Sequence, residues 1–118
     1  MKSKILIIKE IISLDTAVST DNGDLVYKKI IEVINEGKEV EIQLDFSGIT
    51  MMTTAFLNAA IGQLYSKYTG EQLNKLLKLV NVAEDDKILF KKVIDRAKQY
   101  FANKKDFNDS ADTAIYGS

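Results

Sequence analysis

The segment from Glu41 to Tyr65 constrains the fold of this chain more than any other part of the sequence. Residues 39–46 alternate between apolar and polar side chains, which is typical of a strand with one buried face. After a short turn, residues 53–68 carry apolar side chains at the spacing of a helix that packs on a sheet: Phe56, Leu57, Ala60, Ile61, Leu64 and Tyr65. A strand, a turn and an apolar helix in this order indicate an α/β domain.

The rest of the chain continues this alternation of strands and helices. We expect strands over 4–12 and 75–82, helices over 24–35 and from 84 onward, a polar loop over 13–23 and a connection over 69–74. The strand over 75–82 has an alternative, because its leucines and those just before it fit the continuation of a helix equally well. The sequence predicts a single domain over 1–102, built on a small mixed β-sheet with helices mainly on one face. A flexible C-terminal tail is expected over 103–118.

Several chemistries are excluded by composition. The chain has no His and no Cys, so imidazole and thiolate metal sites and histidine-based nucleophile pairs cannot form within it. We therefore expect no catalytic residues, no metal site, no cofactor and no enzymatic activity. The net charge of −1, from interspersed acidic and basic residues, disfavours nucleic-acid binding. No signal peptide or membrane span is evident, so the expected location is the cytoplasm, away from the membrane.

The turn between the predicted strand and helix holds the polar residues with the most chemistry to offer. They are Asp45, Ser47, Gly48, Thr50, Thr53 and Thr54. The simplest account is structural: one threonine caps the helix, worth about 1 kcal/mol, while Asp45 and Ser47 stabilise the turn. The functional account is a phosphoacceptor or an anion site, because the first N–H groups of a helix lack partners and favour negative charge. Met51 and Met52 are expected to be buried, with an adaptable contact surface as the alternative.

This segment, IQLDFSGI followed by TTAFLNAAIGQLY, resembles the STAS domain superfamily of sulfate-transporter domains and anti-sigma-factor antagonists. The similarity is greatest to bacterial STAS-like domains of unknown function. It extends to LVNVAEDDKILFKKVIDRAKQYF and covers the chain from about Asp24 to Phe101. The resemblance implies a STAS-like fold and a regulatory, protein-binding role.

The resemblance also implies a candidate phosphoacceptor. In anti-sigma-factor antagonists an Asp-Ser pair opens this helix, and a partner kinase phosphorylates the Ser. That pair corresponds to Thr53 and Thr54 here, and a following Gly corresponds to Phe56. We therefore expect a non-enzymatic interaction module, related to partner-switching components, whose partner is a kinase-like ATPase or an anti-sigma-type regulator. The alternative is a small-molecule or nucleotide-binding domain that uses the helix N-terminus at Thr53 and Thr54.

Overall fold

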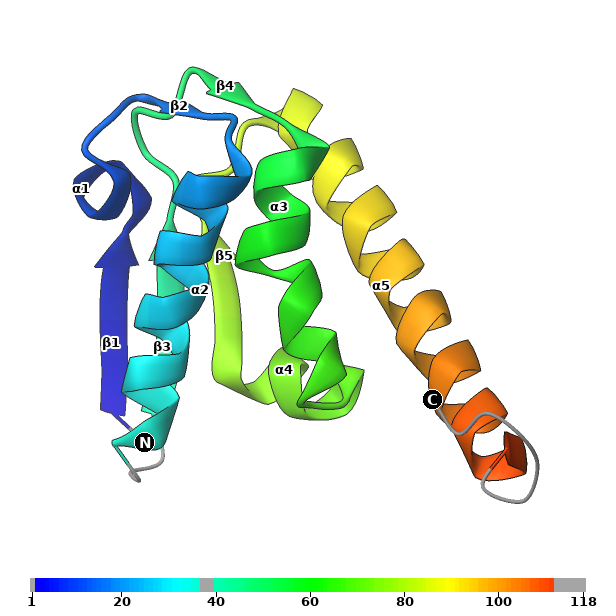
Figure 1. Cartoon of the computed structure of the whole chain (residues 1–118). Coiled ribbons are helices and arrows are strands. Elements are labelled where there is room, and N and C mark those ends of the chain that lie inside the picture. Colours follow the sequence, from blue (N-terminus) through cyan, green and yellow to red (C-terminus); the bar gives the residue numbers. More distant parts are fainter. Residues whose placement is uncertain (1, 37–39, 112–118) are drawn as a thin grey trace.

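Among the residues that the structure describes, five strands form two small parallel sheets. The computed structural model describes residues 2–36 and 40–111. The main sheet has three strands in the order β1-β3-β5, and a separate pair of two-residue strands, β2 and β4, lies beyond one end of it (Figure 1). The strands are β1 (Lys2–Ile7), β2 (Thr16–Ala17), β3 (Val40–Asp45), β4 (Met51–Met52) and β5 (Leu77–Val80).

The helices lie between the strands and after the last one. They are α1 (Ile8–Ile12), α2 (Thr20–Asn35), α3 (Thr54–Ala60), the 3₁₀ helix η1 (Gly62–Ser66), α4 (Gly70–Leu76) and α5 (Glu84–Ala111). Helices α2 and α3 run side by side over one face of the main sheet, and α5 packs against α3 and η1 (Figure 1). The expected coverage of mainly one face is therefore observed.

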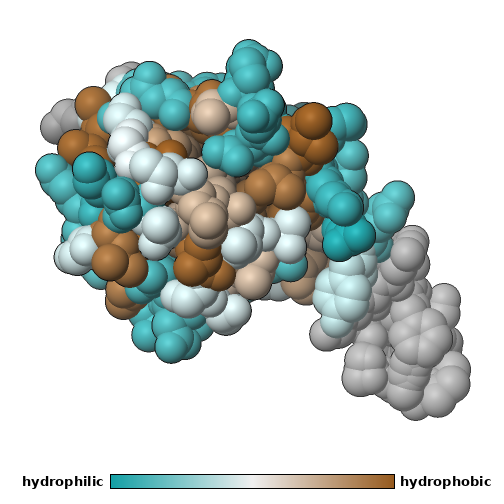
Figure 2. Space-filling view, turned by 90° about the horizontal axis from the view of Figure 1, so that it is seen from above, coloured by the Kyte–Doolittle hydropathy of each residue, from teal (hydrophilic) through white to brown (hydrophobic). Residues whose placement is uncertain are grey.

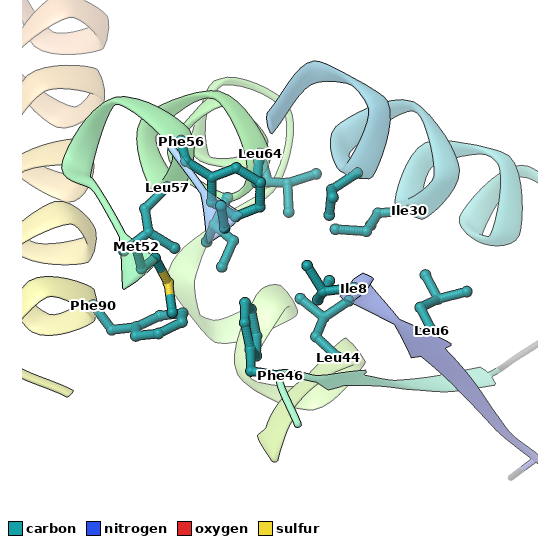
Figure 3. Packing of buried hydrophobic residues seen from close by; sticks show 14 of the residues in the cluster. Leu6, Ile8, Ile30, Leu44, Phe46, Met52, Phe56, Leu57, Leu64 and Phe90 are labelled. Atoms are coloured by element: carbon teal, nitrogen blue, oxygen red, sulfur yellow. The ribbon is translucent and has the colours of Figure 1, made fainter. Parts of the chain in front are cut away.

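The hydrophobic core fills the space between this face of the sheet and the helices. On β3, Ile42 and Leu44 are fully buried, whereas Gln43 between them is partly exposed. Figure 3 shows side chains of the sheet and of α2, α3 and α5 converging on this space. The largest fully buried members are Phe56, Ile8, Ile30, Ile42, Leu44, Leu57, Leu64, Val26 and Val93.

The predicted α/β class is confirmed, but the strand directions differ in one respect. Every strand pair among the described residues is parallel, whereas a mixed sheet was predicted. The connections β1 to β3 and β3 to β5 both contain helices. Such crossovers return the chain to the end where the previous strand began, so the next strand runs in the same direction.

The predicted strand over 4–12 is wrong in its second half. The strand ends at Ile7, which pairs with Asp45 at the end of β3, and the chain then turns into α1. Ile8 and Ile12 are both buried in the core. Their spacing of one helical turn places both side chains on the same face, so tertiary burial overrides the preference of β-branched residues for strands.

The predicted loop over 13–23 contains two elements. Residues Thr16–Ala17 form β2, and α2 begins at Thr20 rather than at Asp24. The Ser19 hydroxyl caps α2 by accepting a hydrogen bond from the Asn22 N–H at 3.1 Å. Gly23 lies within α2 where α3 passes close to it, because an added Cβ would lie 2.5 Å from the Phe56 carbonyl oxygen. The polar residues 20–23, predicted as the end of a loop, therefore form the first turn of α2.

The predicted helix over 53–68 is interrupted, and the predicted connection over 69–74 is helical. Helix α3 ends at Ala60, and the 3₁₀ helix η1 follows. Helix α4 is opened by a capping box in which Thr69 and Gln72 each bond the other's backbone N–H. The leucine-rich segment over 73–80 is therefore helical up to Leu76, where α4 ends, and forms the strand β5 from Leu77 onward.

Two further predicted bounds concern the strand over 39–46 and the last helix. Glu39, the first residue of the predicted strand over 39–46, lies outside the described residues. Helix α5 begins at Glu84 as predicted and runs to Ala111, beyond residue 103, where the tail was expected to begin. Residues 112–118 of that tail lie outside the described residues. The division into a domain over 1–102 and a flexible tail stays a prediction.

Candidate functional site

The six predicted site residues lie at the end of the domain where β3 stops and α3 begins. Asp45 is the last residue of β3, and Thr53 and Thr54 flank the start of α3. The strand β4 lies between them and pairs with β2 in parallel, with Thr16 opposite Met51 and Ala17 opposite Met52. Segment 15–18 therefore contributes to the site, although the sequence indicated only segment 45–54.

Asp45 organises the turn after β3. Its Oδ1 atom accepts hydrogen bonds from the Ser47 backbone N–H at 2.9 Å, the Ser47 hydroxyl at 2.8 Å and the Asn81 side-chain amide at 2.9 Å. These donors, Asn81 first and Ser47 second, hold the pKa of Asp45 below its usual value of 3.8. Asp45 and Ser47 thus have the structural role that the sequence allowed.

Asn81 also belongs to this network, although the sequence analysis missed it. It follows β5 with a left-handed φ of 58°, a conformation that Asn tolerates better than most residues. Its amide connects the ends of β3 and β5 through Asp45. The predicted strand over 75–82 included Asn81, and the preference of Asn for turns was the signal available in the sequence.

Gly48 is required by its backbone conformation and its surroundings. Its φ is +79°, in the left-handed region that favours glycine. An added Cβ would lie 3.2 Å from Cδ of Lys9 and 3.3 Å from its Nζ. Gly48 therefore shapes the turn and allows the Lys9 side chain to pass over it.

Thr50 and Thr53 form hydrogen bonds that connect the segment after β3 to residues 15–18, which precede α2. The Thr50 N–H donates to the Asp15 carbonyl at 2.7 Å, and its hydroxyl donates to the same oxygen at 3.2 Å. The Thr53 N–H donates to the Ala17 carbonyl at 3.1 Å, and its hydroxyl donates to the Val18 carbonyl at 2.8 Å. Sequence patterns could not reveal these partners, because backbone carbonyls are common to all residues.

Thr53 is the N-cap of α3. Its hydroxyl oxygen accepts a hydrogen bond from the Phe56 N–H at 3.2 Å while donating to Val18. It stands where the resemblance expected an Asp, and it accepts the same kind of N–H bond that an Asp N-cap accepts. Phe56, which stands where a Gly was expected, is fully buried in the core.

Thr54 differs from the other hydroxyl residues of the site. It is the first residue of α3 and its side chain is partly exposed. Within residues 2–36 and 40–111, the Thr54 hydroxyl has no hydrogen-bond partner, whereas those of Ser47, Thr50 and Thr53 each bond another group. Among the site hydroxyls of the described residues, that of Thr54 is thus the one that makes no hydrogen bond stabilising the fold.

The two methionines of β4 point to opposite environments. Met52 is buried and lies near Phe90 in the core (Figure 3), whereas Met51 is 57% exposed. The expectation that both are buried is therefore wrong for Met51, because successive strand residues face opposite sides.

A second exposed apolar residue belongs to this end of the domain. Leu14 is 49% exposed and precedes Asp15, whose carbonyl accepts the hydrogen bond from Thr50. We call Leu14, Met51 and Thr54 the β4 surface; Figure 2 views this end and shows apolar patches between polar ones.

Three further features of the described residues bear on the kind of site. No three His, Cys, Asp or Glu side chains in this part of the chain are grouped so as to hold a metal ion. The acidic first turn of α5 includes Glu84, which pairs with Lys87 at 2.8 Å. Among the helices searched, none has the length and apolar character needed to cross a membrane.

Together, the parallel sheet, the helices on one face and the capped helix after β3 define a small α/β domain with a polar turn at its strand ends. The sequence profile that describes the STAS-like domain of unknown function matches residues 22–87, more than half of the chain. The chain belongs to this STAS-like family. Neither curated proteins nor solved structures include a significant match.

Proposed function

We propose that this chain is a non-enzymatic protein-interaction module and that the β4 surface is its binding surface. In this proposal it acts as a partner-switching component related to anti-sigma-factor antagonists, in the cytoplasm. Its partner is a kinase-like ATPase or an anti-sigma-type regulator. The exposed Met51 and Leu14 supply apolar contact area, and the flexible Met side chain adapts to the shape of a partner.

The observation that carries the proposal is the Thr54 hydroxyl, which bonds no other group among the described residues and lies three positions after the exposed Met51 in the sequence. Modification of Ser47, Thr50 or Thr53 would break a hydrogen bond that holds the turn. Modification of Thr54 breaks none that the described residues make. A kinase partner could therefore add phosphate at Thr54 while the domain stays folded.

A phosphate at Thr54 would act mainly through charge. It adds about −1.5 to −2 charges at neutral pH. The first turn of α3 contains no acidic residue, so the positive end of the helix would favour the phosphate. The same charge would lie three residues after Met51 in the sequence and would oppose burial of the apolar residues of the β4 surface. We therefore propose that phosphorylation releases the partner.

The proposal assigns no catalytic role to the site. The carboxylate of Asp45 has a lowered pKa, which makes it a weak base, and its Oδ1 is already bonded by Ser47 and Asn81. The hydroxyl of Thr53 donates to Val18 and is not available as an activated nucleophile.

The experiment combines binding and phosphorylation. Each kinase-like ATPase and anti-sigma-type regulator encoded beside this chain is incubated with it and ATP, and the product is examined by intact mass and peptide mapping. We expect one phosphate, at Thr54, and loss of binding by calorimetry once it is added. Thr54→Glu should weaken binding, and Thr54→Ala should bind but accept no phosphate. Thr20→Ala is the matched control, because Thr20 is likewise the first residue of its helix.

If Thr54→Ala and Thr54→Glu bind every partner as the natural chain does, the switch is excluded. The interaction module itself is then tested by Met51→Asp, which must weaken binding if the β4 surface makes the contact.

The anion-binding alternative has less support, because Thr53 already accepts the Phe56 N–H through its hydroxyl and the Leu57 N–H through its carbonyl. A nucleotide that raises the melting temperature by several degrees would favour that alternative.

A further inference from the structure

The first turn of α2 contains the pair Asn22–Gly23, in which an asparagine amide stands directly before a glycine. No other asparagine in the sequence is followed by glycine. The backbone nitrogen after an asparagine can attack the side-chain amide carbon, and a glycine there has no side chain to hinder the attack. The pair is therefore a candidate site of covalent modification.

Ser19 holds both residues of this pair in the helix. Its hydroxyl accepts a hydrogen bond from the Asn22 N–H at 3.1 Å, and its carbonyl accepts one from the Gly23 N–H at 3.1 Å. The nitrogen that would attack is thus engaged in an intrahelical hydrogen bond at the start of α2. Ring closure also requires rotation about the Asn22 Cα–C bond away from the helical angle. The folded first turn of α2 therefore suppresses the reaction.

The side chain of Asn22 is open to the reaction, and Gly23 is fixed by packing. Asn22 is partly exposed, and within residues 2–36 and 40–111 its side-chain amide makes no hydrogen bond. Gly23 is buried against α3, where an added Cβ would lie 2.5 Å from the Phe56 carbonyl oxygen and 2.6 Å from Cβ of Ala59. The close packing of α2 on α3 therefore requires the glycine that makes Asn22 reactive.

We propose that Asn22 is converted to aspartate and isoaspartate when the first turn of α2 opens. The Gly23 nitrogen forms a bond to the side-chain carbon of Asn22, and its proton leaves with the side-chain nitrogen as ammonia. Water then opens the resulting cyclic imide at either carbonyl. Opening at the side-chain carbonyl gives aspartate, and opening at the backbone carbonyl gives isoaspartate. Overall, a water molecule is consumed and an ammonia molecule is released.

The two products have different effects on the fold. Aspartate at this position places a carboxylate in the first turn of α2, where the positive end of the helix favours it. Isoaspartate adds a methylene to the main chain between the two nitrogens that Ser19 binds, so both hydrogen bonds cannot form while Gly23 keeps its place against α3. Because α2 begins directly after residues 15–18, isoaspartate disturbs the end of the domain to which Thr50 and Thr53 bind.

The test follows the Asn22 amide of the full chain by peptide mapping and mass spectrometry during incubation in mildly alkaline buffer. Isoaspartate is counted separately, by methyl transfer from S-adenosylmethionine with an isoaspartyl methyltransferase. We expect slow loss of the amide in the folded natural chain and much faster loss in urea. Ser19→Ala should accelerate the loss about fivefold, because a helix without its N-cap opens its first turn more often.

Three variants serve as controls, each checked for folding by circular dichroism. Ser19→Asp keeps an acceptor at the N-cap and should react as slowly as the natural chain. Thr69→Ala removes the cap of α4 instead and should leave the rate at Asn22 unchanged. Asn22→Gln keeps an amide on a longer side chain, which would have to close a larger ring, so it should show no conversion at this position.

Three results would overturn the proposal: equal rates with and without urea, a Ser19→Ala rate no higher than that of Ser19→Asp, or amide loss in the folded chain at other asparagines and none at Asn22. The comparison with urea uses the natural chain alone, so it decides even where a variant does not fold. The readout is a covalent change that needs no partner. Failure of this proposal is thereby distinguishable from failure of the proposed function.

Discussion

The hydroxyl of Thr53 donates a 2.8 Å hydrogen bond to the backbone carbonyl of Val18 and joins two segments that lie 35 residues apart in the sequence. The same oxygen caps α3 by accepting the Phe56 N–H. One side chain therefore fixes both the start of α3 and its position beside the start of α2. The hydroxyl of the neighbouring Thr54 bonds no other group among residues 2–36 and 40–111.

We expect Thr53→Ala to lower the free energy of unfolding by about 1–2 kcal/mol, because it removes the N-cap and leaves the Val18 carbonyl without its hydroxyl donor. Urea denaturation measures this change. Thr53→Ser keeps the hydroxyl and should lose much less. Thr54→Ala should change stability by less than about 0.5 kcal/mol. Equal losses for the Thr53→Ala and Thr54→Ala variants would contradict the assignment of Thr53 as the cap.

Gly23 is expected to be intolerant of even a methyl group. In Gly23→Ala the new Cβ would lie 2.5 Å from the Phe56 carbonyl oxygen and 2.6 Å from Cβ of Ala59, so α2 and α3 would have to separate. Overpacking of this kind costs about 1–3 kcal/mol, measured as a fall in the urea midpoint.

Gly62→Ala is the matched control for Gly23→Ala. Its new Cβ would meet nothing nearer than 3.6 Å, at Oδ1 of Asn58, and its φ is not positive. We expect a neutral effect or a gain of about 0.4–1 kcal/mol from the smaller entropy of the unfolded chain. If Gly23→Ala proves as neutral as Gly62→Ala, the close approach of α2 and α3 is wrong.

Asp45 should make stability depend on pH. Its pKa is lowered in the folded state, so its ionised form stabilises the fold at pH values above the unfolded value of about 3.8. This contribution is lost as the pH falls through the lowered pKa. We expect Asp45→Asn to be less stable than the natural chain at neutral pH, and the difference to shrink below about pH 4 in a series of thermal melts.

Asn81→Gly tests the cause of that pKa shift. Glycine accepts the left-handed φ of 58° at this position but lacks the amide that bonds Asp45. An NMR titration of the Asp45 carboxyl carbon should therefore show its pKa rise toward 3.8. An unchanged pKa would mean that Ser47 alone sets the shift.

Phe90 should hold α5 onto the domain. Its ring packs edge-on against that of Phe46, with centroids 5.1 Å apart and an interplanar angle of 84°, and both residues are buried. We expect Phe90→Ala to lower the free energy of unfolding by about 3–5 kcal/mol in urea denaturation. Ile88→Ala, on the same helix but 73% exposed, should stay within about 0.5 kcal/mol of the natural chain.

The sequence alone determined the elements whose side chains have a periodic pattern. The alternation over 39–46 predicted β3, and the apolar spacing after Glu84 predicted the start of α5. The prediction that Thr53 or Thr54 caps a helix is confirmed at Thr53. These features are local, because burial on one face and capping leave their mark on the residues that perform them.

Only the tertiary structure decided how distant segments meet. It turned residues 8–12 from a predicted strand into α1, since Ile8 and Ile12 share a buried face. It paired β2 with β4 through backbone groups of Asp15, Ala17 and Val18, which carry no side-chain signature. It buried Met52 but exposed Met51, and it gave the Thr54 hydroxyl no partner within the described part of the chain. These outcomes depend on long-range packing and backbone hydrogen bonds, which residue patterns along one chain do not encode locally.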